Sequence, residues 1–178
     1  SWKIKWLRIK NLNANPINGR KKLNKNKKMR VVIQRVTFAK VEVDKKIVGE
    51  IEKGMMILVG FENEDTDEDL TWMAGKITAL RIFDDEQGVM NKSIIDADGD
   101  ILCISQFTLH AQTKKGNRPS YIKAAKGEIA EPLYQDFCNK LKNNLNKEIK
   151  KGIFGADMKV SLLNDGPVTI CIDSKNKQ

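Results

Sequence analysis

The side chains best suited to chemistry lie at the end of one apolar segment. Residues 101–109 read Ile-Leu-Cys-Ile-Ser-Gln-Phe-Thr-Leu, so an apolar run gives way to polar groups at Ser105, Gln106 and Thr108. Polar groups on a buried strand need partners or a function. A serine or threonine hydroxyl becomes a nucleophile for acyl transfer when a base lies within hydrogen-bond reach. The chain has one histidine, His110, so the first hypothesis is a hydroxyl–histidine hydrolase.

A continuous strand does not bring these groups together. Alternation of side chains predicts Ser105 on one face of the strand and both Thr108 and His110 on the other. Thr108 shares a face with His110, but side chains two residues apart on one strand diverge. The chain also lacks the G-x-S-x-G turn of serine hydrolases. We therefore predict no catalytic triad, and for His110 a strand-end position without a catalytic role.

No metal or cofactor motif supplies another route. The acidic run 62–69 precedes an apolar helical stripe and is typical of a helix capped at Thr66. The run 96–100 does not place glycine and glutamate as a calcium loop requires, and predicts a hairpin turn. We predict no metal and no cofactor. If the chain is an enzyme, backbone N–H donors and the substrate must do most of the catalysis. An activated ester suits such a site, since one oxyanion donor contributes about 10²–10³ in rate.

Alternating strands and helices must position these residues. Two helices carry clear apolar stripes, one beginning after Thr66 and one beginning at Pro132 and ending near residue 150, and a short helix is predicted over 121–125. Strands are predicted over residues 30–43, 47–51, 55–61, 101–109, 158–163 and 168–172, the last two joined by a turn at Asn164–Pro167. The fold class is therefore α/β, a layered, barrel-like sheet domain of about seven strands with two main helices.

The positive charge is confined to one segment. The net charge is +9, but residues 1–28 hold ten of the 32 lysines and arginines and no acidic residue. The remaining 22 basic and 23 acidic residues leave 29–178 close to neutral. We predict that 1–28 is a basic, disordered extension and that the domain starts at Met29. A dispensable extension, an arm that grips RNA phosphates and an organellar transit peptide all remain open for 1–28. No apolar run is long enough to span a bilayer, so we expect no membrane partner and a cytoplasmic location.

Six motifs in the same order carry a resemblance to a known family. They are residues 29–36 (MRVVIQRV), 81–83 (RIF), 105–109 (SQFTL), 115–119 (KGNRP), 154–158 (FGADM) and 164–169 (NDGPVT). Together they make 29–178 resemble the D-aminoacyl-tRNA deacylases, also called D-tyrosyl-tRNA deacylases. That resemblance implies hydrolysis of the ester between a D-amino acid, or glycine, and the tRNA 3′ end. It also implies a homodimer whose active site crosses the subunit boundary.

The resemblance assigns the reaction to the backbone. The N–H groups of Phe107 and Thr108 would hold the substrate carbonyl oxygen, beside Ser105 and Gln106, and the 2′-hydroxyl of the terminal adenosine would assist. No side chain would act as nucleophile, which agrees with the missing triad.

The resemblance also assigns binding and selectivity. The Gly166–Pro167 peptide would be cis, would enter the partner subunit's site as a chiral filter, and would be positioned by Arg35. A plain turn and a solvated strand arginine are the structural alternatives. Substrate and tRNA contacts would come from Phe154 and Met158 around the adenosine and from Lys114, Lys115 and Arg118 on phosphates.

A filter of this kind works by exclusion. The two enantiomers exchange hydrogen and side chain at Cα, so rigid carbonyls placed where an L side chain projects reject it. Such a filter cannot reject glycine. Two alternatives stay open: a sibling deacylase with a trans Gly-Pro peptide that clears small L-aminoacyl errors, and a non-catalytic nucleic-acid-binding protein that uses the basic arm.

Overall fold

The computed structural model describes residues 29–177, and the predictions for 1–28 lie outside this range. Its largest element is a six-stranded mixed sheet with strand order β2-β1-β3-β6-β7, in which β8 also pairs with β1. β3, β6 and β7 run parallel, whereas β1 is antiparallel to β2, β3 and β8. The strands are β1 (Arg30–Val43), β2 (Lys46–Ile51), β3 (Gly54–Gly60), β6 (Asp100–Ser105), β7 (Lys150–Lys151) and β8 (Lys159–Asp173).

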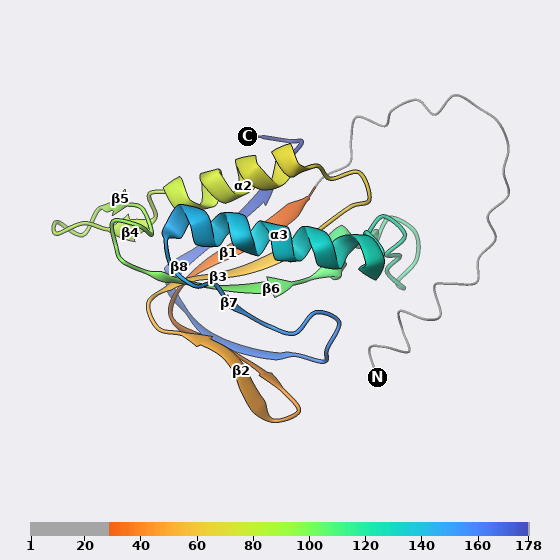
Figure 1. Ribbon diagram of the computed structural model, residues 1–178, viewed down its shortest axis with the longest axis horizontal. Coiled ribbons are helices and arrows are strands. Elements are labelled where there is room, and N and C mark those ends of the chain that lie inside the picture. The colour runs from red at the N-terminus through yellow and green to blue at the C-terminus, as the bar shows by residue number, and fades with distance from the viewer. Residues whose placement is uncertain (1–28, 178) are drawn as a thin grey trace, which may run out of the picture.

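Two helices, α2 (Asp67–Ala79) and α3 (Gly127–Leu145), cover one face of this sheet (Figure 1). The core beneath them includes the fully buried Ile33, Ile57, Ile77 and Phe137. A two-stranded hairpin, β4 (Phe83–Asp84) and β5 (Met90–Lys92), projects beyond the end of α2 (Figure 1). No helix within residues 29–177 is long and apolar enough to cross a membrane.

The opposite face of the sheet is covered by strands, because the sheet bends back over that face. β1 is long enough to bend, and its second half pairs with the first half of β8. Val36, Val41, Leu102 and Ile104 form a second core cluster there, against which Val160 packs. The predicted layered, barrel-like α/β domain with two main helices is therefore confirmed.

The start of α2 is set by the predicted cap. The Thr66 hydroxyl accepts the Asp69 N–H, and the Asp69 carboxylate accepts the Thr66 N–H at 3.0 Å, which is a complete capping box. The acidic run therefore ends in a helix cap. Among residues 29–177 no group of three or more side chains could hold a metal ion.

Several predicted boundaries were wrong. α3 begins at Gly127, so Pro132 lies in its second turn, and the helix ends at Asn146, whose φ of 54° is left-handed. Residues 121–125 form a turn rather than a helix. The turn at 94–98 leads into β6 but makes no hairpin, because β5 pairs with β4. The two predicted C-terminal strands are one continuous strand, β8.

Candidate functional site

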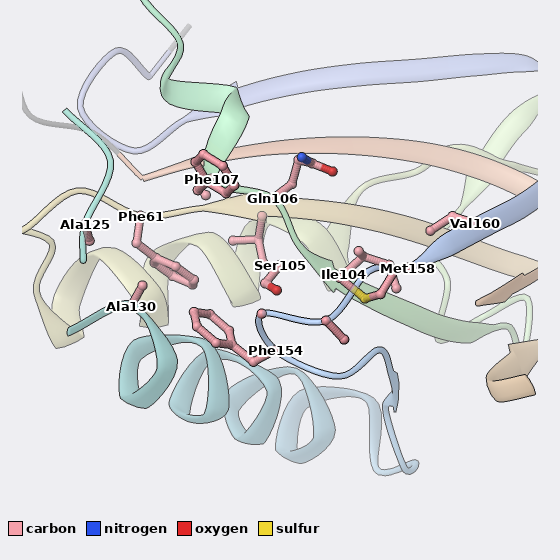
Figure 2. A pocket seen from close by; sticks show the side chains of 14 residues that line it. Phe61, Ile104, Ser105, Gln106, Phe107, Ala125, Ala130, Phe154, Met158 and Val160 are labelled. Carbon is pink, nitrogen blue, oxygen red and sulfur yellow. The ribbon is translucent and has the colours of Figure 1, made fainter. Parts of the chain in front are cut away.

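A cavity of about 100 Å³ opens where β3 and β6 end, between the sheet and the start of α3 (Figure 2). It contains five of the predicted site residues: Ser105, Gln106, Phe107, Phe154 and Met158. None of the fourteen residues that line it carries an ionisable side chain. The cavity therefore offers apolar walls, a hydroxyl, an amide and backbone groups, but no acid, base or charged nucleophile.

The chain leaves the strand earlier than its sequence predicted. β6 ends at Ser105, Gln106 has φ −142° and ψ 86°, and Phe107–His110 form a short 3₁₀ helix, η2. The Gln106 N–H still donates to Val59 O at 2.7 Å, which ties this bend to the end of β3. The predicted strand over 101–109 was therefore wrong beyond Ser105, and so was the alternation of faces built on it.

Backbone donors lie at the start of η2. The Leu109 N–H donates to Gln106 O at 3.3 Å, whereas the Thr108 N–H, one residue earlier, donates to no other residue in the described range. The Gln106 side-chain amide donates to Thr108 Oγ1 at 2.5 Å. This contact occupies the Thr108 hydroxyl and holds Gln106 beside the cavity, although Thr108 itself does not line it.

His110 has a structural position that the sequence did not reveal. Its side chain is 2% exposed, and Nδ1 lies 3.1 Å from Glu62 Oε1. The ring also packs on Gly60, where an added Cβ would lie 2.9 Å from His110 Cδ2 and 2.7 Å from Gln106 O. His110, which was expected at the end of a strand, is thus the buried last residue of η2 and contacts Glu62 and Gly60. It does not line the cavity.

Phe154 and Met158 form the wall opposite β6, on the loop between β7 and β8 (Figure 2). The Phe154 ring contacts the buried Tyr134 of α3, with 6.0 Å between ring centroids. A Cβ on Gly152 would collide with the Met158 sulfur, so this loop packs against the wall residue closely. Both residues line this cavity, and their contact with the adenosine stays a prediction.

Nine of the fourteen lining residues were not predicted as site residues, and three of them lie near the start of α3 or contact the segment before it. Phe61 follows β3, Ala125 precedes α3, and Ala130 lies in its first turn (Figure 2). The Ala125 N–H donates to Phe61 O at 2.8 Å, which joins the two segments. Alanines carry no polar signal, so only their small size, which leaves the space open, marks them in retrospect.

The basic residues Lys114, Lys115 and Arg118 lie on an exposed loop and do not line the cavity. Gln112 and Ser120 pair across the base of this loop, with 2.8 and 3.0 Å hydrogen bonds. Just after it, the Tyr121 ring meets the Phe107 ring edge-on at 5.1 Å. The loop is thus fixed to η2 at one end and free to present its cations to solvent.

Gly166 and Pro167 lie in a bulge of β8. Gln34 of β1 pairs with Thr169 and Val36 pairs with Asn164, so a single β1 residue, Arg35, faces Asp165–Val168. Gly166 and Pro167 are exposed. The Asn164 side-chain amide closes the base of the bulge, donating to Arg35 O and Val168 O at 3.0 Å each.

The Arg35 side chain holds this bulge from beneath. Arg35 is 6% exposed, and its Nε donates to Asp165 O at 3.2 Å. Its Nη1 donates to Ile82 O at 2.6 Å and to Asp84 Oδ1 at 3.2 Å. The alternative of a solvated strand arginine is therefore wrong, because the side chain is buried and joins the bulge, at Asp165, to the segment around β4, at Ile82 and Asp84.

The expected cis peptide is not found. No peptide bond among residues 29–177 is cis, so the Gly166–Pro167 bond is trans. Trans is the favoured isomer before proline by about 0.5–1 kcal/mol. The strand also continues on both sides of the bond, and Gly166, at φ 106°, accommodates the bend.

The bulge and the cavity are separate within one chain. Ser105 pairs with Val59 at one end of β3, whereas Arg35 pairs with Met55 near the other end. Four residues of strand separate these two levels, or about 13 Å. Neither Arg35 nor Gly166 nor Pro167 lines the cavity of its own chain.

Comparisons with known proteins agree on one family. The family model described as D-Tyr-tRNA(Tyr) deacylase matches residues 32–173. A protein of Bacteroides fragilis named D-aminoacyl-tRNA deacylase is 68% identical over 150 residues, which are 84% of this chain and the whole of that protein. A protein of Flavobacterium psychrophilum with the same name is 62% identical over the same coverage.

Two solved structures share the fold. One, titled c-Myc DNA Unwinding Element Binding Protein, has a TM-score of 0.76 and 42% identity and covers 80% of this chain and 97% of its own. The other, titled as a probable eukaryotic D-amino acid tRNA deacylase, has a TM-score of 0.73 and 19% identity, with 82% and 99% coverage. The second shows the fold alone.

Proposed function

The chain belongs to the D-aminoacyl-tRNA deacylase family, and from this premise we propose that it hydrolyses the ester of D-aminoacyl-tRNA, releasing the D-amino acid and free tRNA. The observation that carries the proposal is the cavity at the end of β6, which has a polar rim and no ionisable wall residue. An activated ester is a substrate that such a site can cleave. The reaction would remove D-residues before they enter translation, and we expect it in the cytoplasm, where translation takes place.

The proposed mechanism uses backbone donors. Water adds to the ester carbonyl carbon, negative charge develops on the carbonyl oxygen, and the bond to the ribose oxygen then breaks. The N–H groups of Phe107 and Thr108 stabilise that charge. Ser105 and Gln106 line the same rim and orient the ester, while the 2′-hydroxyl of the terminal adenosine carries the proton.

Substrate binding follows from the walls and the loop. Phe154 and Met158 supply apolar surface for the terminal adenosine. Lys114, Lys115 and Arg118 lie on the exposed loop and are suited to the phosphates of the acceptor end. These phosphate contacts fix the tRNA without reading its sequence.

Selectivity requires a second copy of the chain. The Gly166–Pro167 bulge is exposed and held by Arg35, yet about 13 Å of strand separates its level from the cavity of its own chain. We propose that it enters the partner's cavity in a homodimer and excludes L side chains. Phe38 and Leu163, paired beside the bulge and 44% and 55% exposed, are apolar surface that a second copy would cover. Glycine has no side chain to exclude, so glycyl-tRNA is also a substrate.

The deciding assay compares D-tyrosyl-tRNA, L-tyrosyl-tRNA and L-alanyl-tRNA hydrolysis by the full chain. The proposal expects turnover of the D-ester and no turnover of L-tyrosyl-tRNA. Preference for L-alanyl-tRNA would support the sibling deacylase, which the trans Gly166–Pro167 bond had been expected to accompany. RNA binding without any hydrolysis, abolished by removal of residues 1–28, would instead support the non-catalytic binder.

A mixing experiment tests the cross-subunit site. One chain carries Gly60→Ala, which damages the cavity, and the other carries Gly166→Ala, which damages the bulge. In a mixed dimer, the intact cavity of the second chain receives the intact bulge of the first. Selective D-hydrolysis should therefore reappear on mixing. If the site lay within one chain, the mixture would stay as unselective as Gly166→Ala alone.

A further inference from the structure

Met29, the first residue of the described range, is fixed in the fold. Its side chain is fully buried in the main core, and its carbonyl accepts the Ser174 N–H at 3.0 Å. Ser174 itself is 1% exposed, and its hydroxyl has no partner among the described residues. The backbone around Met29 is thus enclosed rather than trailing into solvent.

A carboxyl group faces the Met29 nitrogen. Asp65 is 8% exposed; its Oδ2 accepts the Glu62 N–H at 2.7 Å, and its Oδ1 has no partner among the described residues. Burial raises the pKa of Asp65 from 3.8 to about 7, against the opposing effect of N–H donors that include Met29. The group is therefore a buried acid that lacks a full set of partners.

Within residues 29–177, the charged neighbours do not neutralise this acid. Glu62 and Asp69 are both negative and raise its pKa further, and Lys175 is bound to Asp69 instead. His110 pairs with Glu62. An unpaired buried carboxylate is costly to retain, whereas one cation at hydrogen-bond distance would offset that cost. The position that lacks a cation is the one that the Met29 nitrogen faces.

We propose that Asp65 is a binding site for the α-ammonium of a chain that begins at Met29. In such a chain the single N–H of Met29 becomes a positively charged group with three donors at the same place. Those donors suit the open Asp65 Oδ1. The relatives of 150 residues, each matched over its whole length, are as long as residues 29–178. Proteins of this extent therefore exist as complete chains.

The site also connects to the reaction centre. Asp65 holds the Glu62 backbone, and the Glu62 carboxylate holds His110 at the end of η2. A charge placed at Met29 therefore stabilises the support beneath the proposed oxyanion donors.

The test compares a chain that starts at Met29 with one that starts at Lys28. The single extra residue converts the α-ammonium at Met29 into an amide, moves the α-ammonium one residue away and adds the Lys28 side chain. Each chain is measured with Asp65 and with Asp65→Asn, by denaturant unfolding at pH 8. Asp65→Asn should lower the folded-to-unfolded ratio at least about tenfold in the Met29 chain, and less than about threefold in the Lys28 chain, since only the former loses an ion pair. Equal losses in both chains would overturn the proposal.

The pH dependence of the free energy of unfolding is a second test, and the raised pKa of Asp65 fixes the direction of the expected change. In the Lys28 chain and the full chain the folded-state pKa of Asp65 is raised, so its favourable contribution is present below about pH 4 and is lost as pH rises to about 7. The free energy of unfolding should fall across that window, and the fall should be absent from the Met29 chain.

A third measurement does not need the Asp65→Asn variant, so it can be made even if that variant does not fold. The α-amine pKa of the folded Met29 chain, followed by NMR of labelled Met29, should rise above its ordinary value of about 8 because of the adjacent carboxylate. An unshifted value, or a Met29 chain less stable than the Lys28 chain, would also overturn the proposal. These readouts are independent of deacylation, so they stand or fall separately from the proposed function.

Discussion

The cavity beside η2 is walled by many side chains from several segments, whereas the Asp165–Val168 bulge depends on one. Phe61, Phe107 and Phe154 each cover a part of the cavity, and losing one leaves the others in place. The bulge is exposed, and the buried Arg35 guanidinium holds it. With the roles proposed above, binding and discrimination depend on separate residues. Substitutions in the cavity should therefore lower activity, and substitutions in the bulge should lower D-to-L selectivity.

The largest effect is expected from Gly60→Ala, on the cavity side of the comparison. A Cβ there would lie 2.7 Å from Gln106 O and 2.9 Å from His110 Cδ2, so η2 must shift. We expect kcat/KM for D-tyrosyl-tRNA to fall about 10²- to 10³-fold, the loss associated with one misplaced oxyanion donor. The D-to-L ratio should stay unchanged.

Gly75→Ala is the matched control. Gly75 lies in α2 with no heavy atom within 4 Å of the added Cβ. This variant should gain about 0.5–1 kcal/mol of stability and keep full activity. If Gly60→Ala were equally active, the cavity would not be the reaction site.

Gly166→Ala should act on the other region. Its Cβ would collide with the Arg35 guanidinium, and its φ of +106° disfavours any side chain. We expect the D-to-L selectivity to fall about 10- to 200-fold, the range for a misfit of one methylene-sized group, while D-tyrosyl-tRNA is still hydrolysed. Steady-state rates on both enantiomers measure this.

The control for backbone strain is Gly116→Ala. Gly116 also has a positive φ, +67°, but its Cβ would meet nothing within 4 Å. Loss of selectivity in both variants would show that strain alone explains the effect and would separate the bulge from discrimination.

Arg35→Lys tests the proposed role of the bulge in selectivity with a smaller structural change. Lysine keeps the charge but loses the planar fork that reaches Ile82, Asp84 and Asp165 together. We expect a stability loss of about 1.5–3 kcal/mol, the cost of one charge-assisted hydrogen bond, and a several-fold drop in selectivity. Arg81→Lys, which loses only an exposed contact to Asn91 O, should leave selectivity intact. Unchanged selectivity in Arg35→Lys would leave the bulge without its proposed positioning residue.

The smallest effect is expected from Thr108→Ala. The substitution keeps the backbone donor and removes only the hydroxyl that accepts from Gln106. We expect kcat/KM to fall less than about tenfold, in line with the 0.5–1.5 kcal/mol of an ordinary hydrogen bond. A loss of about 10⁴-fold would mean that the side chain itself takes part in the chemistry.

The elements that the sequence predicted well are those with strong local signals. The Thr66–Asp69 capping box marks the start of α2, and alternation marks β1 over its whole length. The end of β6 was not predictable in this way. Gln106 and the residues of η2 include neither glycine nor proline, and the bend depends on a bond to Val59 O, which lies in another strand.

At the bulge, in contrast to the end of β6, the local sequence signal was strong but predicted the wrong structure. Asn164–Pro167 carries strong turn residues, so the local signal predicted a hairpin turn between two strands. In the structure β1 pairs on both sides of the segment, and of the four residues left over Asp165 accepts a hydrogen bond from Arg35 and Val168 accepts one from Asn164. Pairing across the sheet therefore overrides the local preference. The co-linear motifs led to the prediction of five of the fourteen residues that line the cavity, but the burial of Arg35 and the pairing of His110 with Glu62 required coordinates.

The order of synthesis determines when the long β1–β8 pairing can form. The ion pair between Arg30 and Asp173 joins residues 143 positions apart, and Arg35 meets Asp165 across 130 positions. A ribosome makes β1 among the first residues of the domain and β8 among the last, so β1 waits for its edge partner until the chain is nearly complete. A nascent chain interrupted before residue 164 has no bulge, although every residue that lines the cavity precedes that point. The proposed role of the bulge in chiral discrimination therefore predicts that selectivity is acquired only when the polypeptide is nearly finished.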